Sequence, residues 1–413
     1  MEIRPILSAL LRSKTGAILV ALQVALSLAI LANALHIVNV RQADAARPSG
    51  IGHEEQIVHI YVRHLVKSNA NEQIVLQNAE TAALRAVSGV TSAAFTSQVP
   101  LSDSGNTTGV AVDRKQLHTT ASVAQYYSAD SLVRTWQLNL VEGRDYRADE
   151  VLDIDNDADD DRFPRIALIT RALAAKMWPN TPNVVGRTFF RGTGDDASAL
   201  QVIGVVERLQ TQGAELGEQG EFSIIVPLRL ANGFGTVYTI RVEPGQRERV
   251  TRDAEAALRK ANGVNPVIMR TKPFDGTRKD RYRADTALSW MLITVSVLLL
   301  IITASGIVGM ASLWVIQRRK QIGVRRALGA RKVDILRYFI TENILITSLG
   351  VVAGVMLAVS LNQLLVAQLH MARLPLGYLA AGAVVFWLLG VAAVYGPAWR
   401  AASISPATAT RST

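Results

Sequence analysis

Basic side chains are the most prominent candidates for chemistry in this sequence, and they gather in Gln317–Arg337, which reads QRRKQIGVRRALGARKVDILR. This stretch, which we call the basic segment, holds eight Lys or Arg residues and one acidic residue. Arginine clusters pair with acidic grooves on partner proteins, and Lys or Arg beside an apolar helix marks the cytoplasmic side of a membrane. The basic segment is therefore both a candidate contact surface and an indicator of membrane orientation.

Several other kinds of site are excluded by composition or by missing motifs. The chain has no cysteine, which excludes disulfides, thiolate catalysis and Cys-ligated metals. It contains no G-x-x-x-x-G-K-[ST] phosphate loop, no H-E-x-x-H and no G-x-S-x-G. The sequence therefore carries no ATPase motif of its own.

Histidine and acidic residues do not predict a metal site either. The six histidines are scattered, and we expect His59 and His64 to be surface or packing residues. The acidic run Asp153–Asp161 lacks the glycine and the final glutamate of a calcium loop, because Ala158 and Pro164 stand at those positions. We expect this run to be a solvated insertion.

Four long runs without a charged residue must position the basic segment. They are 26, 32, 30 and 26 residues long and cover Thr15–Val40, Thr286–Gln317, Asn343–Ala372 and Leu374–Trp399. A helix crosses the ~30 Å hydrocarbon core in about 20 residues, so each run predicts a transmembrane helix. The second run is longer than a span needs, and polar Asp275–Asp285 could extend it as a helix. Its length favours a stalk outside the membrane over a tilted span or one kinked at Gly306 and Gly309.

The first run has a second interpretation. Arg12 and Lys14 precede it, and Ala32-Asn33-Ala34 resembles a signal-peptide cleavage site. The run exceeds the usual apolar region of about 7–15 residues, so we favour a retained membrane anchor.

The distribution of charge predicts the topology. The net charge is +10, but Arg41–Asp285 holds 30 Lys or Arg against 31 Asp or Glu. The N-terminal tail, the basic segment and the C-terminal tail together carry thirteen Lys or Arg, whereas the loop between the third and fourth runs has only Arg373. The positive-inside rule then places both termini and the basic segment in the cytoplasm and the large region outside. Because these cations lie at membrane ends without interleaved aromatic residues, we expect contact with lipid and not with nucleic acid.

The region between the first two runs alternates strand and helix patterns, which predicts an α+β domain. The expected strands are Gln56–Val62, Ile166–Ile169, Leu200–Val206, Ser223–Val226, Thr236–Val242 and Asn265–Arg270. The expected helices are Asn71–Val87, Ala172–Trp178 and Val250–Ala261. We expect two lobes, separated at the exposed break Arg147–Arg162.

The apolar runs contain few polar residues and no ionisable residue at a span centre, which argues against an ion-coupled carrier. Gly350 and Gly354 form a G-x-x-x-G pattern that permits close helix packing, within the chain or across a dimer.

Several segments of the sequence resemble motifs of a known protein family. Lys320–Ala330 (KQIGVRRALGA) resembles the R-E-I-G-I-R-R-A-x-G-A motif that follows the second span of MacB/FtsX-type ABC transporter permeases. Pro397–Ala402 with Ser405–Ala409 is similar to the terminal signature of that family. In the external region, Tyr126–Tyr146 and Val202–Val206, with Ala172–Pro179 and Gly186-Arg187, look like the MacB-type periplasmic core domain. Gln321 departs from the pattern, since the family usually has Glu there.

The resemblance implies a type VII ABC permease-like fold with four transmembrane α-helices and a large α+β periplasmic domain between helices 1 and 2. It implies a bacterial inner-membrane location, a second permease copy, a separate cytoplasmic ABC ATPase that binds ATP and Mg, and possible use of a periplasmic membrane-fusion protein. The chain itself would then be no enzyme and bind no cofactor. ATP-driven motion would reach the periplasmic domain and extrude peptides, antibiotics or other amphiphiles (mechanotransmission). Lipoprotein release and FtsX-like regulation of cell-wall hydrolases are the alternatives, and the regulators have smaller external domains.

The ATPase contact is expected on the basic segment, where the spacing of its glycine and alanine residues favours docking over a simple anchor. The expected coupling residues are Arg319, Gln321, Gly323, Arg325, Arg326, Gly329, Ala330 and Arg331. The expected division of the chain is a cytoplasmic amphipathic N-terminus (1–14), span 1 (15–40), the periplasmic core domain (41–283), span 2 with its stalk (284–316), a cytoplasmic coupling loop (317–340), span 3 (343–368), span 4 (374–396) and a cytoplasmic tail (397–413).

Overall fold

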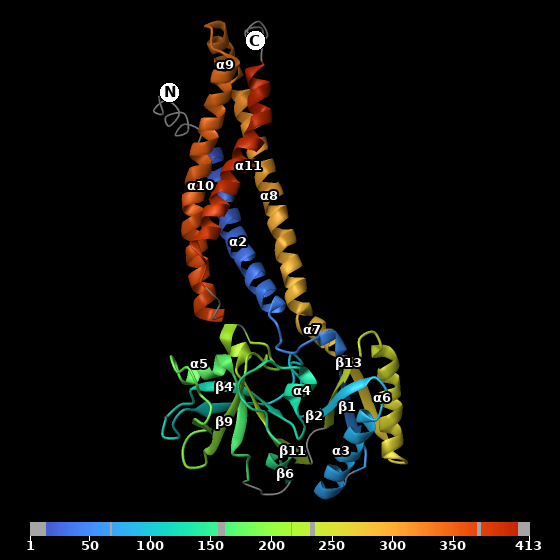
Figure 1. Ribbon diagram of the computed structural model, residues 1–413. Helices are drawn as coiled ribbons and strands as arrows, with labels where there is room; N and C mark the ends of the chain where they lie inside the picture. The colour runs from blue at the N-terminus through green and yellow to red at the C-terminus, as the bar shows by residue number, and fades with distance from the viewer. Residues whose placement is uncertain are drawn as a thin grey trace. The chain divides into compact units, whose positions relative to one another are not determined.

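The computed structural model describes residues 14–66, 68–155, 162–215, 217–231, 236–369 and 373–403. The chain divides into two compact units (Figure 1). Residues 44–284 form one unit, which we call the extramembrane domain, and residues 1–43 with 285–413 form the other, the membrane bundle. The expected amphipathic N-terminus, most of the acidic run and the tail from residue 404 lie outside the described residues.

Four long helices in the described residues are apolar enough to cross a membrane. They are α2 (Lys14–Ala46), α8 (Arg283–Gln317), α10 (Lys332–Leu369) and α11 (Leu376–Ala402). The region expected as a coupling loop is itself mostly helical, because it contains α9 (Arg319–Ala327) and the first turns of α10. Arg and Lys are good helix formers, so a high density of charge does not predict an irregular loop.

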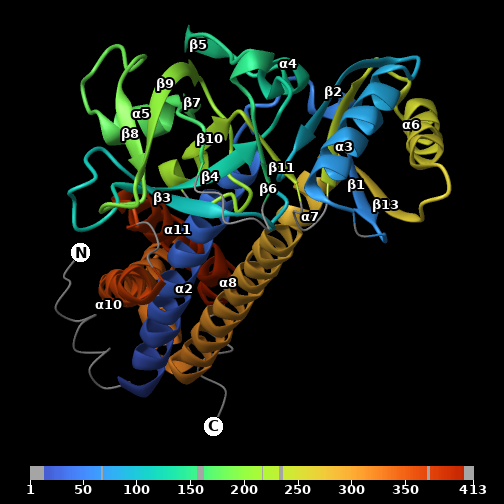
Figure 2. The ribbon, with the colours of Figure 1, turned by 90° about the horizontal axis from the view of Figure 1, so that it is seen from below.

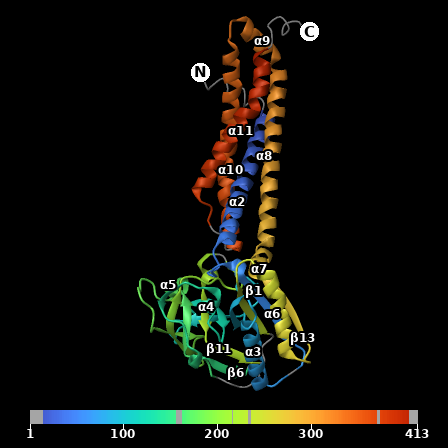
Figure 3. The ribbon, with the colours of Figure 1, turned by 45° about the vertical axis from the view of Figure 1, so that its right-hand side comes forward.

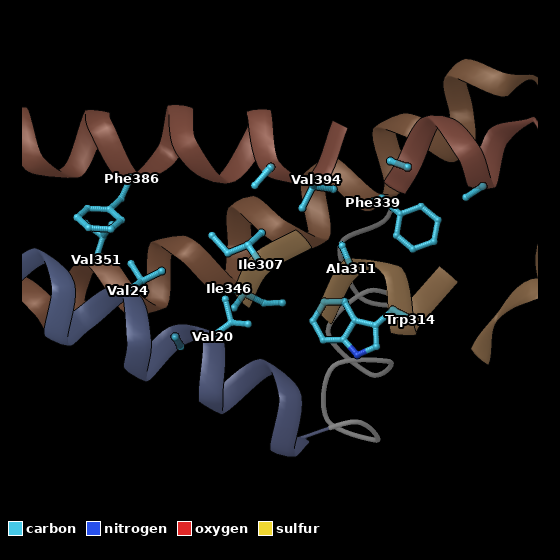
Figure 4. Close-up of a cluster of buried hydrophobic side chains, with 14 of the residues drawn as sticks. Val20, Val24, Ile307, Ala311, Trp314, Phe339, Ile346, Val351, Phe386 and Val394 are labelled. Atoms are coloured by element: carbon cyan, nitrogen blue, oxygen red, sulfur yellow. The ribbon is translucent and has the colours of Figure 1, made fainter. Parts of the chain in front are cut away.

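The core of the membrane bundle is a strip of apolar side chains contributed by all four long helices (Figure 4). Val24 on α2, Ile307 on α8, Ile346 on α10 and Phe386 on α11 are each buried in it. The outward sides of these helices expose large apolar side chains, as expected for a surface that faces lipid.

Glycines bring two of these helices close together. A Cβ added to Gly350 would lie 2.7 Å from the Ala21 carbonyl oxygen, and one added to Gly354 would lie 3.0 Å from Ala25 Cα. The G-x-x-x-G pattern of α10 therefore lies against α2 within the same chain.

Polar side chains inside the bundle bond to neighbouring helices. Ser27 Oγ lies 2.9 Å from Thr303 Oγ1, which joins α2 to α8. Asn33 Nδ2 donates to the Ala358 carbonyl at 3.1 Å, which joins α2 to α10. Such bonds hold helices together in an apolar medium.

The extramembrane domain has two lobes. The first lobe is built on a four-stranded antiparallel sheet in the order β13-β1-β12-β2. Its strands are β1 (Ile57–His64), β2 (Val90–Thr96), β12 (Thr236–Val242) and β13 (Val267–Pro273). One face of this sheet is covered by α3 (Ala70–Arg85) and α6 (Arg247–Asn262), which lie side by side (Figure 2).

The second lobe is built on a seven-stranded mixed sheet in the order β5-β9-β7-β10-β4-β3-β8. Its strands are β3 (Thr107–Ala111), β4 (Ala121–Tyr127), β5 (Leu140–Gly143), β7 (Ile166–Thr170), β8 (Thr188–Arg191), β9 (Ser198–Val206) and β10 (Ser223–Val226). Short elements complete the domain: η1 (Glu54–Gln56), α4 (Leu132–Trp136), η2 (Ala148–Glu150), β6 (Leu152–Asp155), α5 (Arg171–Met177), η3 (Gly217–Glu221), β11 (Leu228–Ala231) and α7 (Phe274–Arg281).

The lobe boundary is not at Arg147–Arg162, where the sequence suggested it. The chain passes between the two sheets after β2 and again after β11. Within the expected break, β6 instead pairs in parallel with β11. The acidic composition of that stretch therefore does not mark a domain boundary.

A shared core joins the two lobes. Ile57 and Phe274 pack there with Trp136 on α4 and with Tyr126 on β4 of the second lobe, and all four side chains are fully buried. Trp136 also donates from Nε1 to Thr239 Oγ1 at 2.8 Å, which joins α4 to β12. The two lobes therefore form one compact domain.

The helix α8 is unbroken over its 35 residues, including Gly306 and Gly309 (Figure 3). The expected helical extension through Asp275–Asp285 is present only in part. The preceding helix α7 ends at Arg281, and Tyr282 separates it from α8.

Candidate coupling site

The basic segment folds as a helix, a tight turn and the start of a second helix. Gly329 has a φ of +96°, in the region that favours glycine. The Ala330 amide donates to the Arg325 carbonyl at 3.0 Å and the Gly329 amide to the Arg326 carbonyl at 3.2 Å. These two bonds form a Schellman motif that ends α9. The Arg331 amide then donates to Asp334 Oδ2 at 3.0 Å, which caps the start of α10.

An ion pair fixes the other end of α9. Arg318 Nη1 lies 2.8 Å from Glu342 Oε2 and also donates to Tyr338 Oη at 3.2 Å. The Glu342 side chain is only 1% exposed. Arg325 lies over the Tyr338 ring, with its Cζ 5.3 Å from the ring centroid. Residues in the first turns of α10 therefore contact both Arg318, just before α9, and Arg325, in the last turn of α9.

The expected coupling residues occupy different environments. Five of them are exposed: Arg319, Gln321, Arg325, Gly329 and Arg331. Arg326 and Ala330 are half-buried, and Gly323 is buried beside Ile322, which belongs to the bundle core. Gly323 therefore packs inward and Gly329 ends the helix, so both glycines shape the site without needing to touch a partner.

Sequence reasoning missed three apolar residues that the structure exposes among the cations. Leu328 is 83% exposed, Val324 53% and Val333 52%. An apolar side chain within so basic a stretch was the available signal. Apolar anchors surrounded by charged residues are typical of protein interfaces.

Comparison with family models identifies the chain. A MacB-like periplasmic core domain matches residues 21–268, and an FtsX-like permease C-terminal region matches residues 293–406. The chain belongs to the MacB/FtsX-like ABC transporter permeases. The MacB-like match alone covers well over half of the sequence of this permease.

Relatives of the permease include larger proteins. It is 25% identical over 266 residues to the pyoverdine export ATP-binding/permease protein PvdT of Pseudomonas syringae pv. syringae (strain B728a), covering 62% of this chain and 39% of that protein. It is 33% identical over 145 residues to the macrolide export ATP-binding/permease protein MacB of Bradyrhizobium diazoefficiens, covering 35% of this chain and 22% of that protein. The chain thus spans well under half the length of these relatives. The periplasmic region of MacB from Actinobacillus actinomycetemcomitans matches 56% of this chain and 94% of that structure, with 15% identity and a TM-score of 0.35.

Two ion pairs lie near the points where the permease chain passes between its two units. In the extramembrane domain, Arg278 donates to both carboxylate oxygens of Glu54, at 2.6 and 2.9 Å, and to the Ala45 and Arg47 carbonyls at 3.1 Å. This arginine ties α7 to the segment that follows α2. In the membrane bundle, Arg41 on α2 pairs with Asp285 on α8. Within each unit, therefore, a charged contact joins the two segments through which the chain enters and leaves that unit.

Proposed function

We propose that this permease couples a separate cytoplasmic ABC ATPase to export across a bacterial inner membrane. The ATPase binds ATP and Mg and docks on the exposed side of α9. A second permease copy, identical or related, completes the complex. The extramembrane domain lies in the periplasm, where it acts on peptides, antibiotics or other amphiphiles.

The preformed shape of α9 is the observation that carries this proposal. Its C-terminal cap and the Arg318–Glu342 pair use only residues of this chain. A partner therefore meets a surface that is already ordered, which lowers the entropic cost of docking. Leu328 offers an apolar anchor, and Arg319 and Arg331 offer positive charge to an acidic groove.

The continuity of α8 supports transmission of motion. Its 35 residues correspond to about 52 Å of helix, whereas the hydrocarbon core is ~30 Å thick. This one helix runs from the end of the extramembrane domain to the start of the basic segment. The bundle's polar side chains bond to neighbouring helices, which fits a permease that moves its external domain and not one that conducts an ion-coupled cargo.

The names of the relatives support export as the outcome. They describe proteins that export a macrolide or pyoverdine. The MacB-like match over most of the external region favours this function over regulation of cell-wall hydrolases.

Co-purification with the ABC ATPase encoded beside the permease tests the docking surface. We expect Leu328→Asp to reduce retained ATPase at least about tenfold, because a charge replaces the apolar anchor at the centre of the contact. The double variant Arg319→Gln/Lys320→Gln should weaken retention in a salt-dependent way.

Matched controls come from the start of α11 and the segment before it. Leu376 is 79% exposed and Arg373 is also exposed, so Leu376→Asp and Arg373→Gln introduce the same changes away from α9. Both controls should retain the ATPase at wild-type levels. Full retention by Leu328→Asp and by the double variant would contradict docking on α9.

A further inference from the structure

A cleft opens between the two lobes of the extramembrane domain. It lies where β1 and β2 end and β12 begins, opposite residues Ser97–Asn106 and Tyr127. Its volume is about 910 Å³, within the range of about 300–1,000 Å³ that is usual for small-molecule sites. The docking surface on α9 belongs to the other unit, so the cleft is a separate feature.

The charge of the cleft is one-sided. Its described lining includes Arg63, Arg270 and Lys272 and no Asp or Glu. Lys272 pairs with Asp280 at 2.6 Å. Neither arginine makes an ion pair within the part of the chain that the structure describes, and both side chains are exposed.

The strand register brings the two arginines to one face of the sheet. Tyr61 lies opposite Arg270, and Arg63 lies opposite Ile268 two residues away on β13. Diagonal neighbours of this kind are about 7–8 Å apart at Cα. Two guanidinium groups at this spacing can bind a carboxylate, sulfonate or phosphate together.

Apolar and polar groups complete the site. Tyr61, Tyr127, Val99 and Ile268 supply apolar surface beside the arginines. Thr277 is 2% exposed and lines the cleft, yet its Oγ1 has no hydrogen-bond partner among the described residues. A buried hydroxyl without a partner is unfavourable unless a ligand or water supplies one.

We propose that this cleft binds a small anionic amphiphile, whose acidic group is held by Arg63 and Arg270 and whose apolar part packs on Tyr61 and Ile268. A cationic ligand is disfavoured, because the described lining holds no carboxylate to offset repulsion by the arginines, and the nearby Asp280 is paired with Lys272. The inference rests on the proposed export function and names the class of its cargo.

Two matched probes test this with the full chain in nanodiscs of zwitterionic lipid. 8-Anilinonaphthalene-1-sulfonate is anionic, and N-phenyl-1-naphthylamine has the same rings without the acid. Empty nanodiscs give the background fluorescence for each probe. We expect Arg63→Gln/Arg270→Gln to weaken binding of the anionic probe at least about tenfold and to leave the neutral probe unchanged. Ile268→Glu removes apolar packing surface and places an acid beside the arginines, so it should weaken binding of both probes, and of the anionic probe more strongly.

Arg259→Gln is the control, because Arg259 is an exposed arginine on α6 outside the cleft lining. Equal affinity of the anionic probe for the wild type and both cleft variants would overturn the proposal, as would equal loss of both probes. Thermal unfolding of each variant checks that the domain is intact. No ATPase is present, so a negative result leaves docking on α9 standing, and loss of that docking would not affect probe binding.

Discussion

Arg318 and Glu342 meet at the end of the membrane bundle, where Arg318 Nη1 lies 3.0 and 2.8 Å from the two carboxylate oxygens of Glu342. Arg318 directly precedes α9, and Glu342 lies on α10, so the pair closes the helix–turn–helix formed by the basic segment. The orientation of α9 therefore depends on a carboxylate that is almost fully buried.

Replacing only one residue of this ion pair should reduce stability more than replacing both. Glu342→Leu leaves the Arg318 cation without its partner, and such a change typically costs about 3–5 kcal/mol. The double variant Arg318→Met/Glu342→Leu should recover most of the lost stability, as measured by unfolding in detergent. Arg337→Met, at an exposed cation on the same helix, is the control. A double variant as unstable as the single one would contradict this account.

Substitution of Gly329 should destabilise the end of α9 because of the backbone conformation at this position. Any side chain at its φ of +96° is strained, so Gly329→Ala should destabilise the cap of α9 by about 1 kcal/mol. Hydrogen exchange should then accelerate at the Gly329 and Ala330 amides, and ATPase retention should fall. Gly396→Ala is the comparison, because its Cβ would meet open space in α11. Unchanged exchange in Gly329→Ala would show that the cap does not hold the turn.

A side chain at Gly350 should destabilise the membrane bundle, because α2 lies directly against this glycine. In Gly350→Ala the new methyl would lie 2.8 Å from Val24 Cβ, so α10 must move away from α2, at a cost of about 1–3 kcal/mol. Gly309→Ala adds the same methyl to α8, where nothing lies within 4 Å. The melting temperature in detergent should fall for the first variant only. Equal melting temperatures would mean that the approach of α10 to α2 is not tight.

His59 should make the extramembrane domain less stable in acid. It is fully buried between Trp136 and Phe274, and burial lowers its pKa from 6.5 to about 3. The folded domain keeps the ring neutral while the unfolded chain protonates it below pH ~6.5, so stability falls as the pH drops from ~6.5 towards 3. At pH 5 the loss is about 2 kcal/mol relative to neutral pH.

Denaturant unfolding at pH 7 and pH 5 measures this effect. His59→Leu should lose less stability between the two pH values than the wild type. His118→Leu, at an exposed histidine, should behave like the wild type. The same pH dependence in His59→Leu and the wild type would show that another group is responsible.

Much of the fold could be predicted because its signals are local. The four apolar runs became the four long helices, and all nine strands and helices expected in the external region are present within three residues at either end. Runs such as Ser223–Val226 and Thr236–Val242 have β-branched or apolar composition that needs no tertiary context. The strands β5 and β6 were missed, since acidic residues interrupt their apolar pattern.

What could not be predicted depends on residues far apart in the chain. The order β13-β1-β12-β2 joins strands from both ends of the domain, so the lobe boundary could not be found from an acidic stretch of sequence. Arg63 and Arg270 share a cleft across 207 positions of sequence, and no local pattern links them. At the candidate site, the motif predicts which segment forms the contact surface. It gave no indication that Leu328 is its most exposed apolar side chain or that Glu342 holds it in place.

The single residue between α7 and α8 has a mechanical consequence. Tyr282 is 6% exposed and belongs to the core shared by the two lobes, and α8 starts at the next residue. Only this residue stands between α7 and α8, so the chain has no long flexible tether at this point. Inserting two or three glycines after Tyr282 would add compliance at that joint. If the proposed coupling acts through α8, such a variant should keep ATP hydrolysis by the partner and lose export.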